Sequence, residues 1–345
     1  MKLHRSMTLG ALAALLGSCG PGSTSPASAA ALGDSRAPAS PRAAPAVDLA
    51  PELELPEGWP RLSEYLGLPV ELASEEYPDG VRRRLAYQLV DRVEGLAVGH
   101  GPEWLWHPNG GIQLQRVLRE GLQEGPFQAW HETGVLRRSG HFLADELDGR
   151  WTYYTDEGEV REIREYRAGE AHGMVREWYP DGSDRAESYW RHGLQSGVER
   201  RWTADGILTL EGHWEAGKRH GPWREFFPED GSPQVVGEYV HGAQAGPWRT
   251  WNQAGVLVRD EHFEQNAWHG LQTLWRDDGS KMSAIEFVQG SPQGRTRAWH
   301  PNGKLQMEGR MDSGRRQGPW SYWLRDGSRN EHWSGTYADD VKVSD

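Results

Sequence analysis

The chain has 345 residues, with 38 basic and 50 acidic side chains, and its formal charge is −12. This acidic balance argues against a nucleic-acid partner, because a phosphate backbone attracts a basic surface. A single cysteine excludes a disulfide framework and an all-cysteine zinc site. The sequence contains no apolar run of the roughly 18–20 residues that a membrane-spanning helix requires.

The first 18 residues have the pattern of a secretory signal peptide. A basic start precedes an apolar run over residues 7–16, which is too short to span a bilayer. Leu-Gly-Ser then leads into Cys19 and resembles a bacterial lipobox. The resemblance implies a lipidated Cys19 and an exported protein anchored in the bacterial cell envelope, with Gly20 favouring the outer membrane. The alternative is an ordinary signal peptide with an incidental cysteine. Residues 19–55, rich in Ala, Pro and Ser, are expected to form a disordered tether.

A repeat dominates the rest of the chain. Ten glycines, here called the anchor glycines, are spaced 24 residues apart, or 25 at one step: Gly101, Gly125, Gly149, Gly173, Gly197, Gly221, Gly246, Gly270, Gly294 and Gly318. An aromatic residue follows each anchor by five positions: Trp106, Trp130, Tyr154, Trp178, Trp202, Phe226, Trp251, Trp275, Trp299 and Trp323. A second apolar position lies seven residues before the next anchor, as at Phe142 and Trp190.

Each repeat reads as strand, tight turn, strand. A glycine nine or ten residues after the anchor often follows Asn or Asp, a pair that accepts positive φ and favours hairpin turns. Four residues before the next anchor lies a second turn residue, always Gly except for Asp145 and Asn266. Glycines at this frequency would break helices. The sequence therefore predicts an all-β protein: an elongated, single-layer antiparallel β-meander of about ten 24-residue hairpin repeats over residues 101–337. Pro directly follows several anchors and indicates a bend there, where the sheet folds over its aromatic row.

These units resemble MORN repeats, in particular the variant of bacterial YwqK-type proteins that are often described as antitoxin components. The resemblance is carried by the Gly-x-aromatic steps at Gly140–Phe142, Gly212–Trp214 and Gly237–Tyr239, with Met311 replacing the aromatic residue in a fourth. Some units lack this glycine, as at Arg164 and Ser188. The resemblance implies a scaffold for protein contacts.

Two interpretations of residues 56–100 stay open. Tyr77-Pro-Asp-Gly80 matches Tyr179-Pro-Asp-Gly182 and predicts a degenerate extra repeat. The apolar spacing of Leu85, Leu89 and Val93 instead fits an N-terminal capping helix. Residues 338–345 are expected to form a C-terminal tail.

The aromatic residues offer one candidate binding surface. The row five residues after each anchor is expected to form the repeat core. Trp151, Trp223, Trp248 and Trp320 lie two residues after their anchors, so regular alternation places them on the other face of the sheet. If that face is exposed, these four tryptophans mark an interaction surface for protein or sugar. The alternative is that a bend of the sheet buries both faces in part.

The sequence predicts no metal site, no cofactor and no catalytic residues. Equivalent histidines of neighbouring repeats are two strands apart, about 9.6 Å, which is too far to share one zinc ion. The chain lacks a nucleophile elbow, a His-Glu-x-x-His motif and a phosphate-binding loop.

Two functions remain: a non-enzymatic, envelope-anchored scaffold that binds a protein, for which the resemblance implies an antitoxin-like or immunity-like role, or a glycan or cell-wall binder that uses exposed aromatic rows. Without a polybasic cluster, we expect contact with the membrane only through the lipid anchor.

Overall fold

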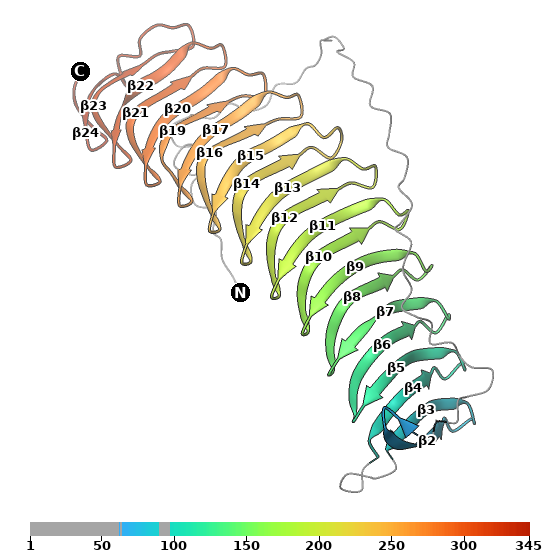
Figure 1. Ribbon diagram of the computed structural model, residues 1–345. Coiled ribbons are helices and arrows are strands. Elements are labelled where there is room, and N and C mark those ends of the chain that lie inside the picture. The colour runs from blue at the N-terminus through green and yellow to red at the C-terminus, as the bar shows by residue number, and fades with distance from the viewer. Residues whose placement is uncertain (1–61, 63, 90–96) are drawn as a thin grey trace. The chain divides into compact units, whose positions relative to one another are not determined.

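The computed structural model describes residue 62 and residues 64–89 and 97–345. The expected signal peptide, Cys19 and the tether lie outside these residues. The described part of the chain folds into 25 antiparallel strands, which pair with one another in chain order except that β17 pairs with both β18 and β19 (Figure 1). It contains no helix of the length and hydropathy needed to cross a membrane. The all-β meander of hairpin repeats is therefore confirmed.

The strands are β1 (Glu64–Tyr65), β2 (Leu68–Glu76), β3 (Arg82–Leu89), β4 (Gly99–Trp106), β5 (Ile112–Arg119), β6 (Leu122–Trp130), β7 (Leu136–Leu143), β8 (Glu146–Tyr154), β9 (Val160–Arg167), β10 (Glu170–Trp178), β11 (Asp184–Arg191), β12 (Leu194–Trp202) and β13 (Leu208–Glu215). They continue as β14 (Lys218–Phe226), β15 (Pro233–Val240), β16 (Ala243–Trp251), β17 (Leu257–Glu264), β18 (Ala267–Trp268), β19 (Gly270–Trp275), β20 (Lys281–Val288), β21 (Ser291–Trp299), β22 (Leu305–Asp312), β23 (Arg315–Tyr322), β24 (Gly335–Ala338) and β25 (Val341–Ser344).

Both ends of the array extend beyond the predicted repeats. β2 and β3 form a hairpin that pairs with β4, so residues 82–89 are a strand and the helical interpretation of this stretch is wrong. At the other end, β25 pairs with β24 and occupies most of the segment that was expected to be a tail. In both places a further hairpin continues the sheet.

The turn that follows each aromatic residue five positions after an anchor glycine has positive φ only at its own glycine. In the turn from Tyr179 to Ser183, the Gly182 N–H donates to the Tyr179 carbonyl over 2.9 Å, and Gly182 has φ 82°. Asp181 keeps negative φ and its carboxylate accepts the N–H of Ser183 at 2.9 Å. The turn therefore has the geometry of a type I turn followed by a glycine bulge, and the aspartate serves as an acceptor.

The return turn at the opposite strand end holds two residues at positive φ. Between β9 and β10 these are Ala168 and Gly169, with φ 49° and 74°, as a two-residue type I′ turn requires. The Gly169 N–H also donates to the carbonyl of Leu147 in the preceding repeat, at 2.9 Å. Successive return turns are thus linked by hydrogen bonds, and the residue before each turn glycine adopts a conformation that L-residues rarely take.

The anchor glycines form bulges. In β10 the register against β9 shifts between Ala171 and Val175, and Gly173 between them has φ 106°. Where a bend is predicted, the structure has a bulge, and a proline can follow because a bulge interrupts the hydrogen-bond ladder.

Candidate functional site

The two faces of the sheet differ in chemistry. We call the face that carries the side chains two residues after each anchor the aromatic face, and the opposite one the charged face. Extensive contacts between elements of the described chain join strands that are neighbours in the sheet, so no second layer covers β5 to β22 there; at the N-terminal end β1 folds back over β4, where the Tyr65 and His100 rings have centroids 5.6 Å apart. Any burial therefore comes from side chains that cover one another.

On the aromatic face, the rings form a chain of contacts across neighbouring strands. Trp223 and Tyr239 have centroids 5.4 Å apart at 86°, and Tyr239 and Trp248 lie 5.0 Å apart at 79°. The chain continues through Phe263, Trp268 and Phe287. Edge-to-face packing, as between Trp223 and Tyr239, suits aromatic quadrupoles because the edge of one ring meets the face of the other.

The four tryptophans of the candidate binding surface are buried. Trp223 and Trp248 belong to this chain of rings, whereas Trp151 packs with Phe127 and Phe142, and Trp320 packs against Tyr322. Trp151, Trp223, Trp248 and Trp320 are only 0 to 5% exposed. The indole N–H of Trp151 donates to the carbonyl of His141 at 3.0 Å, and Trp320 donates to Arg310 at 3.1 Å. The predicted exposed tryptophan surface is therefore wrong, because these side chains lie down across the preceding strand and pack against neighbouring rings.

The row five residues after the anchors contributes less to the core than expected. Only Tyr154 and Trp178 are buried, and they pack with Val160 and Ile163 in a smaller cluster. The remaining members are half-buried: Trp106, Trp130, Trp202, Phe226, Trp251, Trp275, Trp299 and Trp323. The main core row lies two residues after the anchors, on the other face.

Part of the aromatic face remains accessible. Half-buried rings stand seven residues before the next anchor and form what we call the outer aromatic row: Tyr166, Trp190, Trp214, Tyr239 and Phe263. The guanidinium of Arg219 lies 4.2 Å from the Trp223 ring centroid and 5.2 Å from that of Tyr239. Its Nη1 donates to the Tyr239 hydroxyl at 3.0 Å. The surface thus combines aromatic rings with a stacked arginine.

The charged face is internally paired. Arg200 donates to Glu187 at 2.8 Å and to Glu211 at 2.9 Å, and Glu211 also accepts from Arg224 at 3.2 Å. Hydrogen bonding to Arg200 is the main cause that holds the pKa of Glu211 below its ordinary value, and the nearby charge of Arg224 acts in the same direction. These charges satisfy one another and need no partner.

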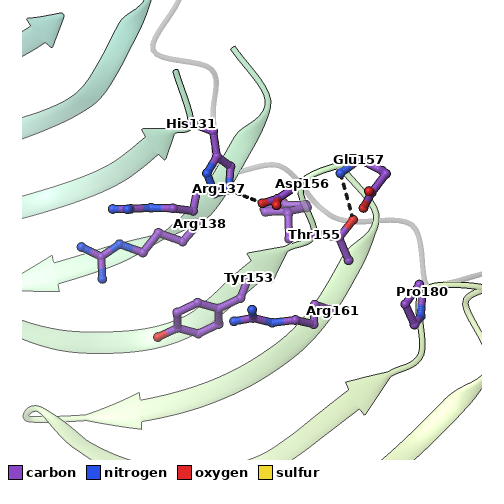
Figure 2. A pocket seen from close by; sticks show the side chains of 10 residues that line it. His131, Arg137, Arg138, Tyr153, Thr155, Asp156, Glu157, Arg161 and Pro180 are labelled. Carbon is purple, nitrogen blue, oxygen red and sulfur yellow. Dashed lines mark hydrogen bonds and ion pairs between the residues drawn. The ribbon is translucent and has the colours of Figure 1, made fainter. Parts of the chain in front are cut away.

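A shallow pocket of about 610 Å³ opens beside the hairpin turns (Figure 2). Arg137, Arg138 and Arg161 line it together with Asp156, which lies 3.4 Å from the His131 Nε2. Burial raises the pKa of nearby Tyr153, as does a 3.3 Å hydrogen bond to Tyr166. The lining mixes both signs of charge and selects no single ligand class.

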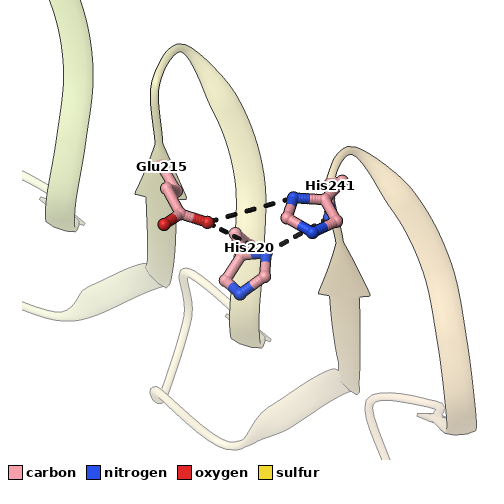
Figure 3. A group of neighbouring side chains, drawn as sticks. All are labelled: Glu215, His220 and His241. Carbon is pink, nitrogen blue, oxygen red and sulfur yellow. Dashed lines mark hydrogen bonds and ion pairs between the residues drawn. The ribbon is translucent and has the colours of Figure 1, made fainter.

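Histidines from non-equivalent repeat positions approach one another at the return-turn edge. His220, directly before an anchor, faces His241 in the next return turn, with ring centroids 4.8 Å apart (Figure 3). Both lie beside Glu215. The separation of about 9.6 Å excludes a shared ion only for histidines at equivalent positions, whereas His220 and His241 occupy non-equivalent positions.

One hairpin matches a known family. Residues 292–312, which span most of β21 and all of β22, match the MORN repeat variant. No curated protein matches the chain. MORN repeats are generally elements of protein interaction and scaffolding.

Solved structures with partial similarity include a TcdB2–TccC3–Cdc42 crystal structure, with 10% identity, 76% of this chain and 18% of that chain covered and a TM-score of 0.18. TcdB2–TccC3 without its hypervariable C-terminal region gives 12% identity, 78% and 18% coverage and 0.18. A mutant Tc holotoxin pore of Photorhabdus luminescens gives 13% identity, 72% and 14% coverage and 0.16. The chain spans less than a fifth of the length of each of these chains.

Proposed function

We propose that the chain is a non-enzymatic scaffold that binds another protein through the aromatic face of its sheet. The observation that carries this proposal is the outer aromatic row, a line of half-exposed rings that no second layer of the described chain covers. Tyr, Trp and Arg dominate the binding energy of protein interfaces. The aromatic face combines these residue types, whereas on the opposite face Arg200 and Arg224 are already paired with glutamates.

Ring geometry favours a protein over the glycan alternative. A sugar stacks on an open ring face, whereas here neighbouring rings meet nearly at right angles: Trp223 with Tyr239 at 86° and Trp248 with Phe263 at 82°. The rings of the outer aromatic row are half-buried in this packing, and a complementary protein surface can pack against the part that stays exposed.

The proposed setting is the bacterial cell envelope. The lipobox-like sequence before Cys19 supports lipidation, and multiple acyl chains anchor a protein stably. Palmitate labelling that is lost in Cys19→Ala would support this anchor, whereas labelling that persists would contradict it. The resemblance to YwqK-type proteins adds a finer hypothesis, namely that the partner is a toxin that the array neutralises.

Two matched arginines test which face binds. Arg259 is exposed on the aromatic face and pairs in register with Thr250, while the neighbouring Arg249 is exposed on the charged face. In capture from native envelope extract by the full chain, we expect Arg259→Glu to weaken recovery of the partner and Arg249→Glu to change it little. The same proteins are tested against a polysaccharide panel. Binding to polysaccharide without a recovered protein, or equal effects of the two reversals, would contradict the proposal.

A further inference from the structure

The return-turn edge holds a cluster of three metal-ligating side chains. Glu215 is the last residue of β13, His220 lies near the start of β14, and His241 begins the return turn between β15 and β16. One ligand atom from each lies within 4.8 Å of the others (Figure 3). The repeat places all three at one edge of the sheet although they are spread over two repeats.

The distances suit a single small cation. The Glu215 Oε2 lies 3.5 Å from the His220 Nδ1 and 3.9 Å from the His241 Nδ1. Ligands bound at about 2.0–2.1 Å around a tetrahedral ion are about 3.3–3.4 Å apart. All three ligand atoms lie within 4.8 Å of one another, so binding of one ion requires side-chain rotations that shorten these separations.

The ligand types restrict the ion. Two imidazoles and one carboxylate suit zinc and neighbouring divalent transition metals, whereas magnesium and calcium prefer all-oxygen sites. The side chains of His220, Glu215 and His241 are 37%, 61% and 74% exposed, so solvent can reach the cluster. Water can therefore supply the fourth ligand, as it does in sites with three protein ligands.

A backbone hydrogen bond defines the state of one candidate ligand. The His241 N–H donates to the His220 Nδ1 at 3.2 Å, so this nitrogen carries a lone pair, which is directed at that N–H. Binding of a metal at Nδ1 would exchange this weak contact for a coordinate bond. Two imidazoles at 4.8 Å would repel each other if both were protonated, and a metal binds both in the neutral form.

The same edge offers a natural control. The Glu264 Oε2 lies 3.2 Å from the His269 Nδ1, yet these residues are not part of a three-ligand group within the described residues. His269 occupies the position directly before an anchor glycine, as His220 does. A general affinity of exposed histidines for metal would therefore involve His269 as well.

We propose that Glu215, His220 and His241 form a binding site for a divalent transition metal ion, with zinc as the representative. The ion would join the end of β13, the start of β14 and the following return turn. It would thereby lock two adjacent return turns against each other.

The test uses the full-length chain without a polyhistidine tag and with Cys19→Ser, so that no thiol competes. Zinc alone is titrated calorimetrically, and cobalt is added separately to detect the visible absorption of a tetrahedral site. We expect one zinc ion per chain and an affinity at least about tenfold weaker in His241→Asn and in His220→Gln. His269→Gln should bind zinc as the parent chain does.

His241→Asn keeps the fold testable, because asparagine tolerates the positive φ of 49° at this position. Circular dichroism without metal should be the same for this variant and the parent. The proposal is overturned if the parent chain binds no zinc, or if His241→Asn and His220→Gln both bind zinc as the parent does. It is also overturned if His269→Gln weakens zinc binding as much as these two substitutions do.

Discussion

Gly140 lies directly beneath the indole ring of Trp151, and a Cβ atom at this glycine would overlap the ring. The same relationship joins Gly212 to Trp223, Gly237 to Trp248 and Gly309 to Trp320. In each pair the tryptophan follows the glycine by 11 residues. This glycine is thus needed where the next repeat carries a tryptophan two residues after its anchor, which explains why Arg164 and Ser188 stand at the equivalent position before Val175 and Glu199.

The first prediction concerns this pair. Gly140→Ala should lower the free energy of unfolding by about 1–3 kcal/mol, because the added methyl group overpacks a core without room for it. The loss should be smaller when Trp151→Phe is already present, since a smaller ring leaves space. A double-mutant cycle from denaturant unfolding measures this coupling. If the two substitutions had additive effects on the free energy of unfolding, the contact with Trp151 would not be what requires glycine at position 140.

The second prediction concerns the return turns. Ala216 has φ 47° in a type I′ turn, a conformation that asparagine tolerates better than alanine. Ala216→Asn should raise the free energy of unfolding by about 0.5–1 kcal/mol, on the scale of compatible turn substitutions. Ala204, in the turn at the other strand end, does not have positive φ and serves as the control. An equal gain from Ala204→Asn would point to a cause other than backbone strain.

The third prediction concerns pH. The pKa of Glu211 in the folded chain is below its ordinary value of 4.5, mainly because Arg200 donates a hydrogen bond to it. The pair therefore stabilises the fold above pH 4.5, and this contribution is lost as pH falls through the lower folded pKa. Arg200→Gln should raise the pKa of Glu211 in an NMR titration and reduce the acid dependence of stability. Arg191→Gln removes an equal charge and should leave that pKa unchanged.

The sequence is sufficient for the hairpin period and for the positions of both turns, because glycine at positive φ leaves a direct signature, as at Gly169 and Gly182. It did not identify the main core row. The alternation of side chains along a strand places Trp151 and Tyr154 on opposite faces of the sheet. It does not reveal on which of the two faces the side chains bury one another. The 11-residue spacing between Gly140 and Trp151 was the available signal, since a glycine under a large ring indicates close packing.

The cluster of Glu215, His220 and His241 was missed for a different reason. The distance between equivalent positions applies only to histidines that occupy the same place in two repeats. This cluster instead combines three different places: the end of a strand, the position directly before an anchor glycine, and a return turn. His241 is 26 positions after Glu215 and 21 after His220. It meets them because its type I′ turn lies next to the return turn of the preceding repeat.

Site-specific photo-cross-linking in the native envelope is the most direct measurement of the proposed function. A photoreactive residue is placed at Arg259 on the aromatic face or at Arg249 on the charged face, two exposed positions on the adjacent strands β17 and β16. Docking on the aromatic face predicts a discrete protein adduct from position 259 and none from position 249. An adduct formed only from position 249, or no protein adduct from either, would contradict it.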